Sequence, residues 1–210
     1  MANLVNHTDK WGSIHIPKTG GTSLTQQLDD TPNTEIVTEK HESIRVFENI
    51  KDYFIFTIIR NPFYRFISSY EHFNRTIFTP VFRNNNWIDE SKIINSKLDI
   101  LYYIQLIEQN KYFMYNTQSF YINDGSSDDK KVSFIGRFEK YDTDLKFIFD
   151  KIKMDFDSKM RLNRNPKSSK YVPDYIVYNE YYKNKIIFDW VLDFYREDFE
   201  NFGYDKKLLK

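Results

Sequence analysis

Apolar residues along the chain follow two spacings, and the first of them is typical of β-strands. Residues 53–59 form an unbroken run of β-branched and aromatic side chains, the pattern of a central strand buried on both faces of a parallel sheet. A shorter run at 12–17 stops at Pro17 and predicts another strand, and two more strands are predicted at 33–38 and 132–136. Strands are therefore expected at intervals along most of the chain.

The second spacing, with apolar residues three or four positions apart, predicts helices between these strands. The best-marked helix begins after Asn61, a suitable N-cap, with Pro62 at its first position. Helices are also predicted over residues 24–28, 42–50, 98–109, 138–154 and 186–194, with Gly203 bounding the last. Strands that alternate with helices in this way predict an α/β fold.

Length and composition restrict the class of protein further. A chain of 210 residues suits one domain over residues 1–210, in which the polar, irregular stretch 77–97 is expected to be an insertion. Lys+Arg and Asp+Glu both total 30, so the net charge is zero, which argues against a nucleic-acid-binding protein and requires any anion site to be local. The absence of cysteine excludes disulfides, cysteine-ligated metals and thiol nucleophiles.

Targeting and membrane signals are not recognised in the chain. The first ten residues lack an apolar signal core, and no run of about 18 apolar residues occurs. A cytoplasmic protein with no transmembrane segment and a loose N-terminus is therefore expected.

The segment 17–23, Pro-Lys-Thr-Gly-Gly-Thr-Ser, lies between a predicted strand and a predicted helix. Glycines at such a turn let backbone N–H groups point at an anion, and the following helix adds the positive end of its dipole. The alternative is a glycine turn with an exposed lysine, which the position after a buried strand disfavours. We interpret the segment as a phosphate cradle whose binding residues are Lys18, Thr19, Gly20, Gly21, Thr22 and Ser23.

The order of residues in this cradle distinguishes it from an ordinary ATP or GTP loop. A Walker A loop has its lysine after the glycines, whereas Lys18 precedes Gly20 and Gly21. Residues 14–24 resemble the 5′-phosphosulfate loop of sulfotransferases that use 3′-phosphoadenosine 5′-phosphosulfate (PAPS), in the carbohydrate branch with heparan- and chondroitin-type enzymes. The resemblance implies a P-loop-like, three-layer domain with a central, mainly parallel sheet flanked by helices.

A second segment resembles the same family. Residues 59–70 are similar to its 3′-phosphate motif, with Arg60 at a strand end and Ser68 eight positions later. Asn61, Arg65 and Ser68 recur at i, i+4 and i+7, so they share one helix face, which can point toward Arg60. The resemblance implies that Arg60 and Ser68 bind the donor's 3′-phosphate, through a guanidinium fork and a hydroxyl.

Three further segments are similar to the family. Residues 134–139 resemble its late strand, where Arg137 and Glu139 are expected to serve the fold more than the nucleotide. Residues 195–204 resemble its C-terminal helix, with a packing role. The basic loop 163–170 corresponds loosely to a nucleotide-covering loop in relatives; its cations are Arg164, Lys167 and Lys170.

Sulfuryl transfer to a hydroxyl needs a base for the proton and a cation for the leaving phosphate oxygen. Lys18 is the natural cation. His41 is the expected base, because it lies at a strand-to-helix junction where ligand-facing residues gather. Residues 40–43 also resemble the family's segment with a catalytic histidine, and an imidazole pKa near 6.5 suits a base at neutral pH.

The remaining histidines have structural rather than catalytic explanations. His7 lies near the expected loose terminus, His15 in the first strand as a core histidine, and His72 on the helix beyond Ser68. His41 itself could be an exposed neighbour of a helix N-cap. The fallback bases are Glu39 and Glu42.

Together these patterns predict an enzyme that moves a sulfuryl group from PAPS to a hydroxyl by in-line displacement, without a metal. The family resemblance favours a carbohydrate or glycolipid acceptor, which the insertion at 77–97 would border. A kinase-like phosphotransferase is the first alternative, but it would need an acidic strand end near the loop, where this chain has Arg60. A non-catalytic nucleotide-binding module is the second alternative.

Overall fold

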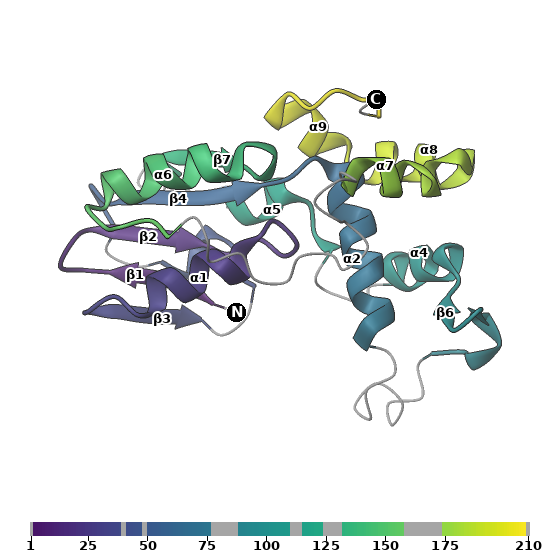
Figure 1. The fold of residues 1–210 in the computed structure, drawn as a ribbon, viewed down its shortest axis with the longest axis horizontal. Coiled ribbons are helices and arrows are strands. Elements are labelled where there is room, and N and C mark those ends of the chain that lie inside the picture. The colour runs from purple at the N-terminus through teal and green to yellow at the C-terminus, as the bar shows by residue number, and fades with distance from the viewer. Residues whose placement is uncertain are drawn as a thin grey trace.

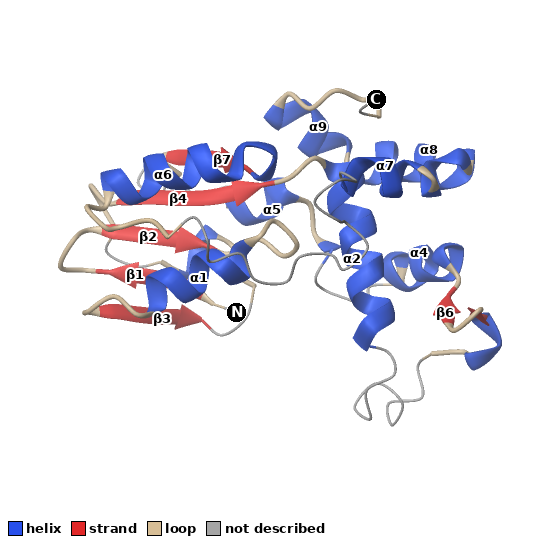
Figure 2. Ribbon diagram, viewed as in Figure 1, coloured by secondary structure: helices blue, strands red, loops and turns tan. Residues whose placement is uncertain are grey.

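The computed structural model describes residues 2–38, 41–47, 50–76, 88–109, 115–123, 132–157 and 174–208. A five-stranded sheet occupies one half of the molecule, and a group of helices forms the other half (Figures 1 and 2). In spatial order the strands are β3 (Thr34–Thr38), β1 (Asn3–Asn6), β2 (Trp11–Ile14), β4 (Phe54–Ile59) and β7 (Phe134–Arg137). Strands β2, β4 and β7 run parallel, and β1 is antiparallel to β2 and β3. The predicted α/β fold with a mainly parallel sheet is confirmed.

Both faces of the sheet are covered, which makes three layers (Figure 1). One face packs against α1 (Gly21–Asp29) and α6 (Tyr141–Lys151). The other face packs against the short 3₁₀ turn η1 (Ile44–Val46) and α5 (Gln118–Ile122).

The central strand β4 contributes to both layers of core. Phe56 and Ile58 belong to the α1 and α6 side, whereas Ile55 and Ile59 belong to the opposite side. All four side chains are at most 2% exposed. Alternate residues of a strand point to opposite faces, so an unbroken apolar run is what a strand buried on both faces requires.

The helical half has its own aromatic core around α2, whose buried stripe includes Phe63, Phe66 and Phe73. Its helices are α2 (Pro62–Thr76), α4 (Ile100–Glu108), α7 (Asp174–Asn179), α8 (Lys185–Phe194) and α9 (Arg196–Phe202). Its shorter elements are η2 (Glu90–Lys92), β5 (Ile93–Ile94), β6 (Lys97–Leu98) and η5 (Tyr181–Lys183), whereas η4 (Phe138–Lys140) lies between β7 and α6. Because α2 follows β4 directly, it joins the sheet to this helical core.

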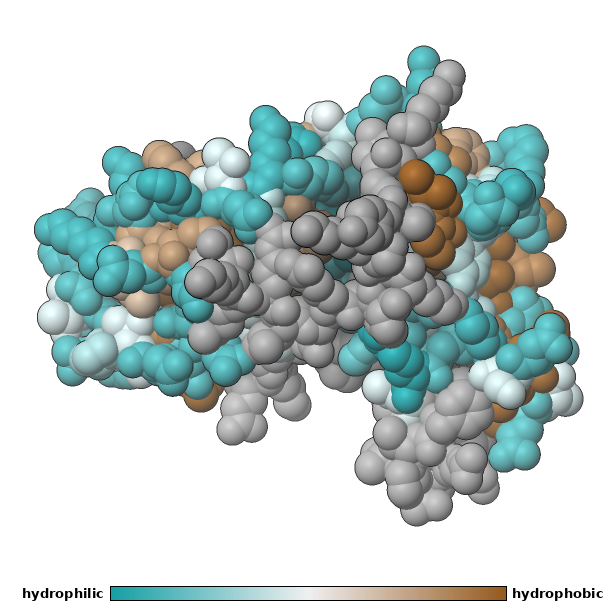
Figure 3. Space-filling model, in the orientation of Figure 1, coloured by the Kyte–Doolittle hydropathy of each residue, from teal (hydrophilic) through white to brown (hydrophobic). Residues whose placement is uncertain are grey.

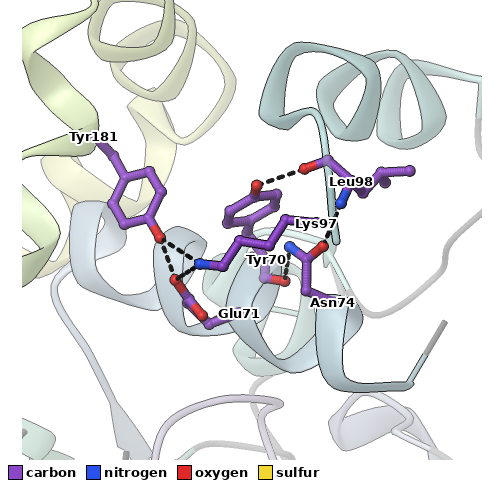
Figure 4. Close-up of polar contacts among 6 residues, drawn as sticks. All are labelled: Tyr70, Glu71, Asn74, Lys97, Leu98 and Tyr181. Atoms are coloured by element: carbon purple, nitrogen blue, oxygen red, sulfur yellow. Dashed lines mark hydrogen bonds and ion pairs between the residues drawn. The ribbon is translucent and has the colours of Figure 1, made fainter. Parts of the chain in front are cut away.

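Polar contacts attach the β5–β6 hairpin to α2 (Figure 4). The Glu71 carboxylate accepts hydrogen bonds from Lys97 Nζ at 3.2 Å and from the Tyr181 hydroxyl. One turn further along α2, Asn74 Oδ1 accepts from the backbone N–H of Leu98 at 2.6 Å. The described part of the predicted insertion, residues 88–97, is therefore an ordered hairpin against α2, while residues 77–87 lie outside the described residues.

The prediction of a loose N-terminus is wrong, because β1 lies inside the sheet between β3 and β2. Two of its four residues, Asn3 and Asn6, are polar yet fully buried. Their amides donate to the carbonyls of Glu42 and Pro32, both at 3.0 Å. Buried amides with partners are tolerated in a core, but in the sequence they hide the strand from a search for apolar alternation.

Two predicted helices also differ from the structure. Over 42–50 the described part contains only the single turn η1, although Ile44, Phe47 and Ile50 are buried as their spacing suggested. The helix predicted at 138–154 begins as a 3₁₀ turn and ends at Lys151, before Lys153 adopts a positive φ of 58°. The remaining predicted helices and strands are present, with boundaries displaced by a few residues.

Where residues are coloured in Figure 3, most are polar, and the most strongly apolar ones lie toward the helical end. Ile176 and Ile186, on α7 and α8, are 50% and 65% exposed. No helix within the described ranges is both long enough and apolar enough to span a bilayer.

Candidate functional site

The predicted cradle joins the end of β2 to α1 in a tight turn. Lys18 and Gly20 both have positive φ, of 68° and 87°, and the Thr19 hydroxyl donates to the Ile16 carbonyl at 2.9 Å. Gly20 is the N-cap of α1 and has no side chain to satisfy the first N–H groups of the helix. An uncapped helix N-terminus beside a lysine suits an anion.

Both glycines are required because other side chains fill the space around them. A Cβ on Gly20 would lie 2.8 Å from the ring of Tyr141, and one on Gly21 would lie 2.5 Å from the ring of His15. The Tyr141 hydroxyl donates to the Gly20 carbonyl at 2.7 Å, so the start of α6 also fixes the turn. These contacts hold the backbone of the cradle close to its neighbours.

Arg60 lies at the carboxyl end of β4 and reaches the cradle. Its Nη1 donates to the Lys18 carbonyl at 3.4 Å, and its guanidinium lies 4.3 Å from the centre of the Phe138 ring. The side chain is 5% exposed. The structure therefore brings the Arg60 side chain into contact with the backbone of Lys18.

The Arg60 peptide is held by residues that the sequence analysis did not identify. Gln118 on α5 accepts from the Arg60 N–H at 2.7 Å and donates to its carbonyl at 2.9 Å. Gln118 in turn donates from its backbone to the buried Asp198 carboxylate at 2.8 Å, as does Ser119. These residues are far apart in sequence and no local motif marks them.

Arg65 is a second cationic contact to the cradle, and the sequence suggested it only through the face that it shares with Ser68. Its Nε donates to the Pro17 carbonyl and its Nη1 to the Asn116 carbonyl, both at 3.0 Å, and it is 2% exposed. Ser68 lies about one turn further along α2 and is half-buried. This face of α2 is therefore turned toward the cradle.

Glu139 supports the start of α2. Its carboxylate accepts from the Asn61 N–H at 2.7 Å and from the Tyr204 hydroxyl at 3.1 Å, while Asn61 Oδ1 caps the helix by accepting from the Phe63 N–H at 3.0 Å. Arg137 packs on the Tyr204 ring, 4.5 Å from its centre. Both residues serve the fold, in agreement with the expectation from sequence.

The electrostatics of this region favour an anion. Burial, together with the positive charges of Arg75 and Arg60, lowers the pKa of Lys18 to about 7. Burial, Lys18 and Arg75 lower the pKa of His72 to about 4. Within the described ranges no carboxylate makes an ion pair with Lys18. Several positive charges around a cradle too tight for a Cβ favour the binding of an anion.

His41 lies beside the cradle and is half-buried. Its Nδ1 is 3.3 Å from the His15 carbonyl oxygen, and the two rings are 4.9 Å apart between centres. A carbonyl can only accept, so Nδ1 carries the proton and Nε2 keeps a lone pair. Burial lowers the pKa of His41, which keeps the ring neutral at pH 7.

The other candidate bases and histidines take different places. His7 is exposed and contacts the Tyr53 hydroxyl at 2.9 Å, and His15 is 4% exposed with Nδ1 3.0 Å from the Thr25 hydroxyl. Glu42 offers its backbone carbonyl to Asn3, whereas Glu39 lies outside the described residues. The basic loop 163–170 also lies outside them.

Metal ligands are not grouped among the described residues of this site. In the part of the chain that the structure describes, no three histidine or carboxylate side chains lie close enough together to hold a metal ion.

Comparison with known proteins supports one family. A model of the sulfotransferase family matches residues 3–205, nearly the whole chain. Comparisons with curated proteins and with solved structures find no match. Because the family match covers nearly the whole chain, the chain belongs to the sulfotransferase family.

Proposed function

We propose that this sulfotransferase takes its sulfuryl group from PAPS and transfers it to a carbohydrate hydroxyl, with His41 as base and Lys18 as the cation for the leaving group. The observation that carries the proposal is that Arg60 contacts the cradle at Lys18, while His41 packs on the His15 ring, which adjoins Gly21 of the same cradle. A donor with a 5′-phosphosulfate and a 3′-phosphate needs polar groups for both; the cradle is proposed for the first, and Arg60 at the end of β4 with Ser68 on α2 for the second.

The chemistry assigned to the residues is an in-line displacement. The acceptor oxygen forms a bond to sulfur as its proton passes to His41 Nε2, and the bond from sulfur to the phosphate oxygen breaks. Negative charge then grows on the departing phosphate, where Lys18 and the N–H groups at the start of α1 stabilise it. The product is 3′,5′-ADP together with a sulfate ester.

Support for His41 as the base comes from its tautomer and its protonation state. Its Nδ1 is engaged with the His15 carbonyl, so Nε2 is the nitrogen left for an acceptor proton. Its lowered pKa leaves it unprotonated at neutral pH. The carbohydrate acceptor rests on the sequence resemblance, and both it and the cytoplasmic location remain predictions.

Transfer of labelled sulfate from radioactive PAPS to a panel of glycans tests the proposal. The wild-type protein should label at least one glycan. His41→Ala should lose about 10²-fold to 10⁴-fold in kcat while its affinity for 3′,5′-ADP stays near that of the wild type. His7→Ala, which removes an exposed histidine distant from the cradle, is the matched control and should keep normal turnover.

Three outcomes would count against the proposal. Normal turnover by His41→Ala would remove His41 as the base. Binding of 3′,5′-ADP without transfer to any glycan would favour a non-catalytic module. Transfer of phosphate from Mg²⁺-ATP in place of sulfate would favour the phosphotransferase.

A further inference from the structure

The His41 segment, residues 41–42, is hydrogen-bonded to the sheet through the buried amide of Asn3 on β1. Asn3 on β1 is fully buried, and its Oδ1 accepts from the His15 N–H at 2.8 Å. Its Nδ2 donates to the Glu42 carbonyl at 3.0 Å. This orientation of the amide is the one that satisfies both partners, because the reversed amide would oppose donor to donor and acceptor to acceptor.

The His15 ring lies between His41 and the cradle. On one side its centre is 4.9 Å from that of His41, with the rings inclined by 48°. On the other side its atoms occupy the space where a Cβ of Gly21 would be, and its Nδ1 is 3.0 Å from the Thr25 hydroxyl on α1. One ring therefore touches both the candidate base and the first turn of the donor-binding helix.

His15 is uncharged at neutral pH, which is compatible with a role as a spacer between His41 and α1. Burial lowers its pKa well below the usual range, and the neighbouring His41 acts in the same direction. Lys18 lowers it further. A neutral ring adds no repulsion to the cations of the site, whereas a charged one would oppose Lys18.

We propose that Asn3 and His15 are positioning residues that set the place of His41 relative to the donor cradle. Asn3 links the backbone of His15 to that of Glu42, and the His15 ring sets the spacing between His41 and α1. The proposal rests on His41 being the base, as proposed above, and neither residue is assigned contact with the donor or the acceptor.

The chain contains a matched control for Asn3. Asn6, also on β1 and also fully buried, uses its amide in the same way: Nδ2 donates to the Pro32 carbonyl at 3.0 Å, and Oδ1 accepts from the Asp9 N–H at 2.8 Å. Asn3→Ala and Asn6→Ala therefore lose equivalent pairs of hydrogen bonds, but only Asn3→Ala releases the His41 segment.

The decisive measurement compares these variants with the wild type. Asn3→Ala should lower kcat by about 10-fold to 100-fold, the loss expected from a shift of about 1 Å at a catalytic group, with the Kd for 3′,5′-ADP changed by less than about twofold. Asn6→Ala should keep kcat near the wild-type value at a similar thermal midpoint. His15→Ala, which removes the ring between His41 and Gly21, should lower kcat with unchanged KM for PAPS.

A second measurement does not depend on activity. In an NMR titration of the histidine ring protons, Asn3→Ala should raise the pKa of His41 toward its ordinary value, because burial is the largest cause of its lowering and the freed segment is better hydrated. Asn6→Ala should leave that pKa unchanged. Equal kcat and equal His41 titration in the two asparagine variants would overturn the positioning role. A shifted titration in a protein that transfers no sulfate would instead refute only the proposed function.

Discussion

The lowered pKa of Lys18 predicts that binding of 3′,5′-ADP weakens as pH rises through the neutral range. In the free protein Lys18 has a pKa of about 7, against an ordinary value of 10.5, so most molecules lose this charge above pH 7.5. A bound phosphate favours the charged lysine and raises its pKa again. The free protein must therefore take up a proton to bind, and this cost grows with pH.

The size of the effect follows from the fraction of Lys18 that is charged before binding. Between pH 7.5 and pH 9 that fraction falls by about 25-fold, provided that Lys18 stays protonated in the complex. The affinity should fall by the same factor, or about 1.9 kcal/mol. The phosphates of the ligand do not obscure the trend, since their second ionisation, near pH 6, is almost complete over this range.

Isothermal titration calorimetry is the assay, in buffers with different heats of ionisation. At pH 8 it should report uptake of about 0.9 proton for each 3′,5′-ADP bound. Lys18→Arg keeps its charge at every pH used, so its affinity should not depend on pH in this range. A wild-type affinity that is constant from pH 7.5 to pH 9, or a Lys18→Arg profile identical to that of the wild type, would refute the reasoning.

Two further predictions concern the support of the site. Gly21→Ala should lower the free energy of unfolding by about 1–3 kcal/mol, because the new Cβ would lie 2.5 Å from the His15 ring, whereas Gly203→Ala has open space and should cost about 1 kcal/mol for its positive φ. Urea unfolding checks this, and equal losses would contradict it. Asp198→Asn should cost about 2–3 kcal/mol and weaken 3′,5′-ADP binding, since the carboxylate accepts from Gln118 and Ser119 and Gln118 holds the Arg60 peptide. Asp193→Asn, at an exposed ion pair with Arg196, is its control and should change stability by less than about 1 kcal/mol.

The candidate site was partly predictable because each of its motifs is local. In 17–23 the glycines, the lysine and the helix start lie within one turn, so their joint effect can be deduced from their order. The relative position of Arg60 and Ser68 was also predictable, because a helix of known pitch begins directly after Arg60 and Asn61 and carries Ser68. No local motif could indicate the support from Gln118, Asp198 and Asn3, because their partners lie 12 to 80 residues away.

The wrong predictions share a physical cause. The strand β1 was missed because its Asn3 and Asn6 are polar, although burial with full hydrogen bonding makes them suitable for a core. Residues 42–50 have helical spacing, but in their described part Ile44 and Phe47 reach the sheet from a single 3₁₀ turn. In both cases tertiary contacts outweighed the local pattern.

The sequence alone determined the α/β class, the central strand, the helix that begins at Pro62, and the residue types gathered for an anion, because periodicity, capping and motif spacing are local properties. Only the tertiary structure decided that Arg60 contacts the Lys18 backbone, that burial and nearby arginine charges lower the pKa of Lys18, and that His41 carries its proton on Nδ1. These properties depend on distances and burial between segments far apart in the chain, and a one-dimensional pattern does not contain them.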